Sequence, residues 1–199
     1  MNTLEFIVKR YNVDTPLVSP IQLPHGRSEL ALLFKELGYK VGAEIGVDHG
    51  YYSEALCQAN PNVKLYCIDP WKVYRKYEDI KDEHDMNKRY GFAKKRLARY
   101  NCEIIKKSST GALKDFKPES LDFVYIDGNH AFDYVMEDLN GWSKIVRKDG
   151  IISGHDYKSR RRELIGVGRA VDLYIKEHNI KMLFRLVKNN DSSWFFVNE

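Results

Sequence analysis

The sequence predicts an α/β fold in which a mostly parallel sheet of seven strands carries helices on both faces. Short apolar runs that end in Gly, Asp or Ser alternate with segments whose apolar residues recur every three or four positions. Helical segments of that length can cross over between parallel strands. The last two apolar runs are joined only by Asn189-Asn190-Asp191-Ser192, which indicates an antiparallel hairpin at the C-terminal end.

The elements follow in order along the chain. The first 24 residues contain three prolines and little periodicity, so we expect residues 1–26 to form an arm or lid and residues 27–199 to form the domain. A first helix is expected over Arg27–Leu37, before Gly38. The expected strands are Val41–Gly46, Val63–Asp69, Cys102–Lys106, Leu121–Asp127, Gly150–Gly154, Lys181–Lys188 and Ser193–Val197. The other expected helices are 51–59, 83–99, 109–116, 131–146 and 163–178.

Composition narrows the class of protein. A chain of 199 residues is long enough for one domain with an ordinary core. The three cysteines, Cys57, Cys67 and Cys102, form no CxxC pair, which argues against a zinc site and for small buried side chains in a reducing compartment. No apolar run has the length of a membrane span, and we expect a cytoplasmic protein. The net charge of +4 permits an anionic partner without requiring one.

The first strand leads directly into a helix through the turn Glu44-Ile45-Gly46-Val47-Asp48-His49-Gly50. Gly46 lets the backbone turn sharply, and Gly50 lets a ligand approach the start of the helix. The turn lacks the third glycine of the dinucleotide fingerprint, and its acids would repel a pyrophosphate. A zwitterionic amino acid beside a sulfonium tolerates those acids. The alternative is a tight turn that binds nothing.

The second strand ends in Asp69, followed by Pro70 and Trp71. An acid at this strand end accepts hydrogen bonds from ribose hydroxyls, and its spacing from Gly46 is close to the ~20 residues expected for that role. As an alternative, Asp69 caps a helix that begins at Pro70. The glycine turn and Asp69 together favour the ribose role.

These two segments resemble the first two motifs of class I methyltransferases. The stretch Asp122-Phe-Val-Tyr-Ile-Asp127-Gly-Asn-His130, followed by Asp138-Leu139 and Gly150-Ile-Ile-Ser-Gly154-His155-Asp156-Tyr157, resembles the small-molecule O-methyltransferase branch related to the macrocin O-methyltransferases. More distantly it is similar to the catechol O-methyltransferases.

The resemblance implies a Rossmann-like sheet, S-adenosylmethionine as the cofactor and methyl transfer to a hydroxyl of a small molecule. That family often carries an acid after the third strand for the adenine amino group, where this chain has Lys107-Ser108-Ser109. We expect a serine to substitute. The expected cofactor-binding residues are Glu44, Gly46, Asp48, His49, Gly50, Asp69, Pro70, Trp71, Ser108, Ser109 and Asp127.

Asp127 and Asp156 end two strands that should be neighbours in the sheet, so their carboxylates should converge. Two such carboxylates repel, and a hard divalent cation between them, Mg²⁺ or Ca²⁺, would relieve the repulsion. In the catechol-type enzymes a similar pair binds a metal, but there the second acid is followed by Asn, and here by Tyr157. The alternative is that Asp127 and Asp156 bind substrate or backbone amides unaided.

His130 and His155 flank the two acids and are the candidates for a general base that removes the hydroxyl proton. The sequence gives a slight preference to His155. The expected acceptor is a sugar or an anionic metabolite, and the arginine run 160–162, which follows Asp156 closely, could hold a phosphate or carboxylate of the latter. Two alternatives remain: a nucleic-acid methyltransferase, suggested by the same run and a pI of 8.8, and a non-catalytic S-adenosylmethionine-binding partner in a complex. A homo-oligomer is compatible with the sequence.

Overall fold

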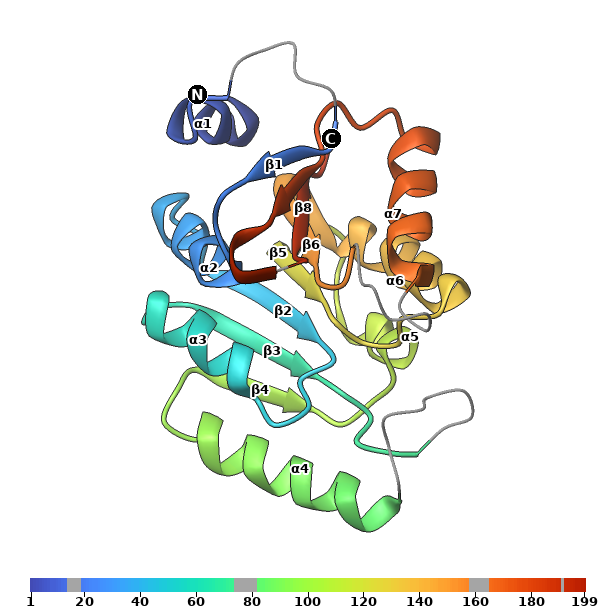
Figure 1. The fold of residues 1–199 in the computed structure, drawn as a ribbon. Helices are drawn as coiled ribbons and strands as arrows, with labels where there is room; N and C mark the ends of the chain where they lie inside the picture. Colours follow the sequence, from blue (N-terminus) through green and yellow to red (C-terminus); the bar gives the residue numbers. More distant parts are fainter. Residues whose placement is uncertain (14–18, 74–81, 158–164, 191) are drawn as a thin grey trace.

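The computed structural model describes residues 1–13, 19–73, 82–157, 165–190 and 192–199. Within them one sheet has the strand order β1-β7-β8-β6-β5-β2-β3-β4 and carries helices on both faces (Figure 1). Its strands are β1 (Ile21–Leu23), β2 (Val41–Ile45), β3 (Lys64–Ile68), β4 (Cys102–Ile105), β5 (Leu121–Ile126), β6 (Val146–Gly154), β7 (Phe184–Leu186) and β8 (Trp194–Val197). The helices are α1 (Thr3–Arg10), α2 (Arg27–Glu36), α3 (Tyr51–Ala59), α4 (Glu83–Leu97), α5 (Ser109–Ala112), α6 (Phe132–Ile145) and α7 (Ile165–Glu177), with 3₁₀ turns η1 (Leu113–Asp115) and η3 (Lys188–Asn190).

The α/β class and the C-terminal antiparallel hairpin are confirmed, but the described sheet has eight strands where seven were predicted. The additional strand is β1, which pairs in parallel with β7. It lies between Pro20 and Pro24 and is too short to show an alternating pattern, which is why the sequence did not predict it. Both α1 and β1 fall within the segment 1–26, expected as an arm or lid, and they contribute buried Ile7, Ile21 and Leu23 to the core.

Most predicted elements shift by one or two residues, and three differ by more. The predicted strand Lys181–Lys188 is shortened to β7, Phe184–Leu186. Strand β6 begins at Val146 rather than Gly150, because α6 ends at Ile145 and the chain enters the strand directly. A register shift in the β5–β6 pairing between Leu121 and Phe123 accommodates this early start. The predicted helix 109–116 is divided into α5 and η1.

Strand β5 separates two hydrophobic layers. Phe123 and Tyr125 contribute to the layer beneath α2, α3 and α4, whereas Val124 and Ile126 contribute to the layer beneath α6 and α7. Successive side chains of a strand point to opposite faces, and all four are buried, as expected for a parallel sheet covered on both sides. Strands β2 to β6 run parallel, so their carboxyl ends meet at one edge of the sheet (Figure 1).

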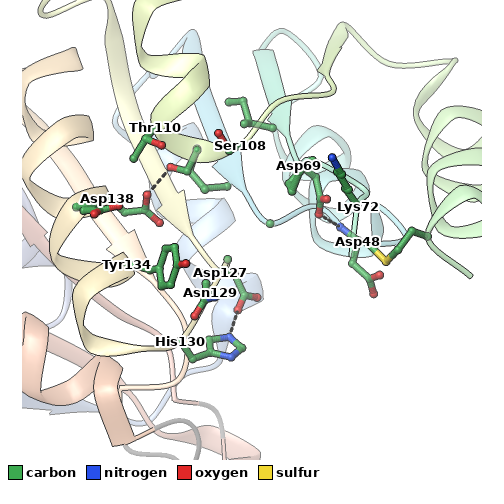
Figure 2. A pocket seen from close by; sticks show the side chains of 18 of the residues that line it. Asp48, Asp69, Lys72, Ser108, Thr110, Asp127, Asn129, His130, Tyr134 and Asp138 are labelled. Carbon is green, nitrogen blue, oxygen red and sulfur yellow. Dashed lines mark hydrogen bonds and ion pairs between the residues drawn. The ribbon is translucent and has the colours of Figure 1, made fainter. Parts of the chain in front are cut away.

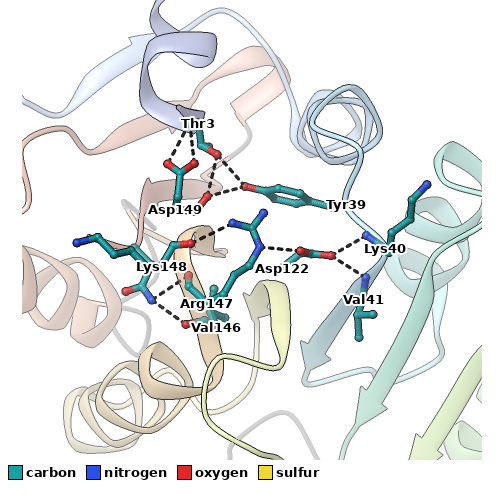
Figure 3. Close-up of polar contacts among 10 residues, drawn as sticks. Thr3, Tyr39, Lys40, Val41, Asp122, Val146, Arg147, Lys148 and Asp149 are labelled. Carbon is teal, nitrogen blue, oxygen red and sulfur yellow. Dashed lines mark hydrogen bonds and ion pairs between the residues drawn. The ribbon is translucent and has the colours of Figure 1, made fainter. Parts of the chain in front are cut away.

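The opposite edge, where these strands begin, is closed by a polar network (Figure 3). One Asp122 oxygen accepts from the amides of Lys40 and Val41 at 2.7 and 3.0 Å, and the other accepts from Arg147 Nε at 2.8 Å. Burial raises the pKa of Asp122, but these bonds outweigh it and lower that pKa overall. The Thr3 amide donates to both Asp149 carboxylate oxygens, which ties α1 to the start of β6.

Candidate functional site

A cavity of about 530 Å³ opens at the carboxyl ends of β2 to β5 (Figure 2). Parallel α/β sheets bind ligands at this edge, because the loops that leave the strands splay apart there. Eight of the predicted site residues line it: Gly46, Asp48, Asp69, Pro70, Ser108, Ser109, Asp127 and His130. Six others are not among the described lining residues: Glu44, His49, Gly50, Trp71, His155 and Asp156.

The turn after β2 is fixed by its glycine. Gly46 has φ 89°, and a Cβ there would lie 2.1 Å from the carbonyl oxygen of Asp127. No other residue fits so close to a neighbouring backbone. Gly50, in contrast, faces α4, where a Cβ would contact the Leu97 side chain at 3.3 Å. Gly46 therefore brings the loops after β2 and β5 together, whereas Gly50 serves the packing of α3 on α4.

Asp69 lies at the end of β3 with both carboxylate oxygens in use. One accepts from the Asp48 amide at 3.0 Å and the other from the Trp71 amide at 2.7 Å. Burial raises the pKa of Asp69 above its usual value, although these bonds oppose the shift. Each oxygen keeps a second lone pair, so the group can still accept hydroxyl donors from a ligand. Trp71 is buried, and its indole N–H donates to the Asp48 carbonyl at 2.9 Å.

Asp48 presents a paired charge at the same end of the cavity. Arg89 Nη1 lies 2.8 Å from one of its oxygens and His49 Nδ1 lies 2.7 Å from the other. Burial raises the pKa of Asp48, but both partners lower it by a larger total, so the carboxylate is held ionised. Arg89 and Lys72 also line the cavity, so this end offers charges of both signs.

Glu44 lies inside β2, away from the cavity lining. Its side chain is 2% exposed and accepts a hydrogen bond from Ser53 of α3. Burial raises its pKa to about 8, with a further contribution from Asp127. At neutral pH the group is therefore largely protonated, and its position supports the strand–helix junction rather than a direct ligand contact.

The far end of the cavity is formed by the turn after β4 and by α6. Ser108 caps α5 by accepting from the Gly111 amide at 3.2 Å. The Ser109 hydroxyl donates to Asp138 and accepts from Trp142 Nε1 at 2.8 Å. Asp138 is 4% exposed, and burial raises its pKa to about 7. Its second oxygen faces Gly128, where a Cβ would lie 3.9 Å from it.

The polar lining residues that sequence reasoning did not assign to the site are Lys72, Arg89, Thr110, Asn129, Tyr134, Glu137 and Asp138. Asp138 had a detectable signal, because it interrupts the apolar face of α6 made by Val135, Leu139 and Trp142. Asn129 accepts from the Ala131 amide at 2.9 Å, which fixes its side-chain orientation, and its buried Nδ2 has no hydrogen-bond partner among the described residues. Neither of these two features of Asn129 has a signature in the local sequence.

Two acids and a histidine meet at the ends of β5 and β6. His130 Nε2 lies 3.6 Å from Asp127 Oδ1 and 3.3 Å from Asp156 Oδ2. One ligating atom of each residue lies within 4.8 Å of the other two. Asp156 has φ 59°, a left-handed conformation that costs free energy for a non-glycine residue and is enriched at functional sites. The predicted convergence of Asp127 and Asp156 is thus present in the structure.

His155 contacts the same Asp156 oxygen as His130 does, with 3.3 Å between His155 Nδ1 and Asp156 Oδ2. Burial lowers the pKa of His155, but the bond to Asp156 and the charges of Asp127 and Asp156 raise it by more. The Asp156 pKa moves downward, because His155 and His130 outweigh its burial. The arginine run 160–162 lies outside the described residues.

Comparisons with known proteins agree with this geometry. The family described as a methyltransferase domain matches residues 43–157, which include the glycine turn, Asp69 and the cluster around Asp127. An uncharacterised protein, R132, from Acanthamoeba polyphaga mimivirus is 29% identical over 119 residues, 59% of this chain and 52% of its own length. The chain thus spans about half the length of that relative.

Solved structures share the fold at low identity. The O-methyltransferase of Bacillus cereus in complex with SAH has a TM-score of 0.60 and 18% identity, covering 98% of this chain and 90% of that one. The O-methyltransferase TomG of Streptomyces achromogenes, in complex with SAM, has a TM-score of 0.60 and 17% identity, covering 96% and 86%. In the described part of the chain, no helix is long and apolar enough to cross a membrane. Since the family match covers more than half of the chain, this protein belongs to the methyltransferase-domain family.

Proposed function

We propose that the protein is an S-adenosylmethionine-dependent methyltransferase that methylates a hydroxyl of a small molecule. The observation that carries this proposal is the joint position of Gly46 and Asp69 on one cavity, at the carboxyl edge of a methyltransferase-family sheet. A turn without a Cβ and a carboxylate with lone pairs to spare are the two features that a nucleoside attached to an amino acid requires.

The cavity suits each part of that cofactor. The end with Asp48, Arg89 and Lys72 carries both signs of charge, which matches a zwitterionic amino acid. Asp69 is placed to accept from the ribose hydroxyls. The adenine lies towards Ser108 and Asp138, so that the acid absent from the turn after β4 is supplied by α6. The Ser109 hydroxyl already donates to Asp138, which leaves the second Asp138 oxygen for the adenine amino group.

The chemistry follows from the cluster beside this cavity. When bound, S-adenosylmethionine supplies an electrophilic methyl group, which an acceptor oxygen attacks in line as the bond to sulfur breaks. His130 lines the cavity, whereas His155 does not, so His130 is the better placed to accept the hydroxyl proton. Asp127 and Asp156 lie within 3.6 Å of His130 Nε2 and would stabilise the imidazolium that forms. Positioning of the acceptor oxygen supplies the rest of the rate enhancement.

A metal is the second version of this mechanism. The oxygens of Asp127 and Asp156 are donors that Mg²⁺ or Ca²⁺ accepts, but the third ligand available is the His130 nitrogen, which these hard ions disfavour. The donor set therefore fits such an ion only in part. If a metal is required, exhaustive EDTA treatment abolishes turnover and Mg²⁺ restores it, and His155 takes the role of base. Turnover that EDTA leaves unchanged supports the version with His130.

Calorimetry tests the cofactor directly. S-adenosylhomocysteine should bind, NAD should not, and Asp69→Ala should weaken binding by about 1.5–3 kcal/mol, the value of a charged hydrogen bond. Equal affinity of both proteins would remove Asp69 from the ribose role. Nucleic-acid methylation predicts tight binding of a short RNA that weakens steeply with salt, and a non-catalytic binding partner predicts cofactor binding without methyl transfer to any hydroxyl compound. Location in the cytoplasm and homo-oligomer formation stay predictions.

A further inference from the structure

A second cavity, of about 570 Å³, lies beside His155. Its other walls are the segment that leads into α2 and the turn that follows β7. The described residues that line it are His25, Gly26, Arg27, Ser28, Glu29, His155, Lys188 and Asn189. None of them lines the cofactor cavity.

The side chains of this second cavity are predominantly basic. Arg27 and Lys188 are cations at neutral pH, and His25 and His155 become cations when protonated. Glu29 is the one acid among the described lining residues, and its carboxylate lies 2.8 Å from Arg10 Nη1. Arg10 lies outside the lining and also pairs with Glu36, so it offsets the Glu29 charge only in part. Arg27 and Lys188 still outnumber this one acid among the described lining residues. The net field within the cavity favours an anion.

One contact fixes Arg27 in place, and the start of a helix adds positive partial charge. The Arg27 guanidinium lies 5.0 Å from the centre of the Tyr52 ring, a cation–π arrangement that holds the side chain against α3. Gly26 directly precedes α2 and offers no side-chain cap, so the positive end of the helix faces the same space. A rigid cation at a helix start is better suited to bind an anion than a mobile surface lysine is.

The cavity is connected to the reaction centre through one acid. His155 lines the second cavity and contacts Asp156, and Asp156 contacts His130, which lines the cofactor cavity; both contacts are 3.3 Å. Burial is the largest influence on the Arg27 pKa and lowers it, but Tyr125 and Asp127 together raise it by more. The charge of Asp127, in the reaction centre, therefore acts on Arg27 as well. A chain of side-chain contacts through Asp156 thus links the second cavity to the cofactor cavity.

We propose that the second cavity binds an anionic group of the methyl acceptor, a phosphate or a carboxylate, and so presents the acceptor hydroxyl to the cluster of two acids and a histidine at the ends of β5 and β6. Arg27 and Lys188 hold the anion by charge-assisted hydrogen bonds, and His155 lies between the anion and the hydroxyl. This inference rests on the proposed function and names its substrate class. It does not depend on the arginine run 160–162.

Titration calorimetry of the full chain saturated with S-adenosylhomocysteine tests the proposal, with inorganic phosphate and acetate as probes at constant ionic strength. At least one probe should bind saturably, and Lys188→Gln and Arg27→Gln should each weaken that binding about tenfold, the value of one charge-assisted hydrogen bond. Preference for phosphate or for acetate identifies which anionic group the acceptor carries. The matched control is Lys181→Gln, a lysine whose 71% exposed side chain lies 3.9 Å from Glu199 and outside the cavity, and it should leave binding unchanged.

The absence of saturable binding by either probe, or equal binding by the wild type and Lys188→Gln, would overturn the proposal. Arg27 contacts Tyr52, so a folding defect in its variant is detected by circular dichroism, and Lys188→Gln, at an exposed position, then decides the question alone. Affinity for S-adenosylhomocysteine should be the same in all variants. If the wild type fails to bind S-adenosylhomocysteine, the proposed function fails instead, whatever the anion result.

Discussion

Aspartates lie at both edges of the sheet, and Asp122 at the amino edge contrasts with Asp69 and Asp138 at the carboxyl edge. Two other aspartates at the carboxyl edge, Asp48 and Asp156, have lowered pKa values because cationic partners contact them. At the amino edge, both oxygens of Asp122 accept strong bonds from backbone and arginine, and its pKa is lowered (Figure 3). At the carboxyl edge, Asp69 and Asp138 are almost fully buried, their pKa values are raised, and Asp138 keeps an oxygen towards the cavity. The same side chain stabilises the fold at one edge and is left able to bind a ligand at the other.

Backbone strain occurs at both edges. Asp48, Trp71 and Asp156 have positive φ values at the carboxyl edge and Asp149 has φ 63° at the amino edge, a conformation that costs a non-glycine residue about 1–3 kcal/mol. Favourable packing of the helices and strands behind these residues must offset that free-energy cost. A comparison of variants at the two edges therefore separates residues that maintain the fold from residues that the ligand needs.

The largest effect is expected from Gly46→Ala. The new Cβ would lie 2.1 Å from the Asp127 carbonyl oxygen at a φ of 89°, so the two loops must separate. We expect a loss of about 3 kcal/mol or more in the free energy of unfolding, and no binding of S-adenosylhomocysteine. Urea denaturation and calorimetry measure both.

Gly91→Ala is the matched control. Gly91 lies within α4, and a Cβ there would have nothing within 4 Å, so the change should stabilise the protein by about 0.5–1 kcal/mol. If Gly46→Ala behaves like this control, the close contact between the loops is not required for binding.

Asp122→Ala should have the next largest effect, and on stability alone. It leaves the Lys40 and Val41 amides and Arg147 without their acceptor, at a cost of about 2–3 kcal/mol in the free energy of unfolding. Because the folded-state pKa is lowered, this contribution is present above the unfolded pKa and disappears as the pH falls through the folded pKa. The difference in stability between the two proteins should shrink in acid, with cofactor affinity unchanged throughout. A large loss of affinity would contradict the division between the edges.

Asp138→Asn should have a smaller effect of opposite sign. The folded state raises the Asp138 pKa to about 7, so it retains a proton that the unfolded chain releases near pH 4. Stability therefore falls as the pH rises between those two values and is constant above them. The variant should lose this dependence and be more stable than the wild type at pH 8. Thermal melts from pH 4 to 8 measure it, with the exposed Glu177→Gln at the end of α7 as the control. Identical curves for wild type and Asp138→Asn would show that Asp138 carries no such shift.

The smallest effect is expected from Lys107→Ala, at the carboxyl edge but on the surface. Lys107 pairs with Asp115 at 2.7 Å, and both side chains are more than a third exposed. Such pairs contribute at most about 1 kcal/mol to stability. Binding of S-adenosylhomocysteine should change less than twofold. A larger change would show that charge at this edge matters even without burial.

Local pattern was enough to predict most of the sheet. The runs that became β2, β3 and β5 are apolar and bounded by turn residues, so their burial was visible in the sequence. The run that became β4 was found in the same way, although at the edge of the sheet its residues are not fully buried. Strand β1 was not predictable in this way, because it is defined by its pairing with β7 rather than by its own three residues. Cys57 and Cys102 illustrate the same limit, since their sulfurs lie 3.4 Å apart although neither position suggests a partner.

The candidate site shows the same distinction between residues that local pattern predicts and residues that packing brings into place. Asp69, Asp127 and Asp156 were predicted because each ends a strand, and parallel strands end at a common edge. Asp138 was missed because it reaches the cavity from the middle of α6, two turns beyond any strand end. Strand ends can be located by periodicity alone, whereas the side chain that a helix directs at a cavity depends on how that helix packs.

Strand β1 has a consequence for how the molecule behaves at high concentration. As the edge strand of the sheet, it has one side of its backbone without a partner strand among the described residues. Long open edges of this kind recruit strands from other molecules and lead to aggregation. Here the edge is only three residues long and is flanked by Pro20 and Pro24, which cannot donate a hydrogen bond. The brevity that hides β1 from sequence patterning also makes it a poor template for intermolecular strand addition.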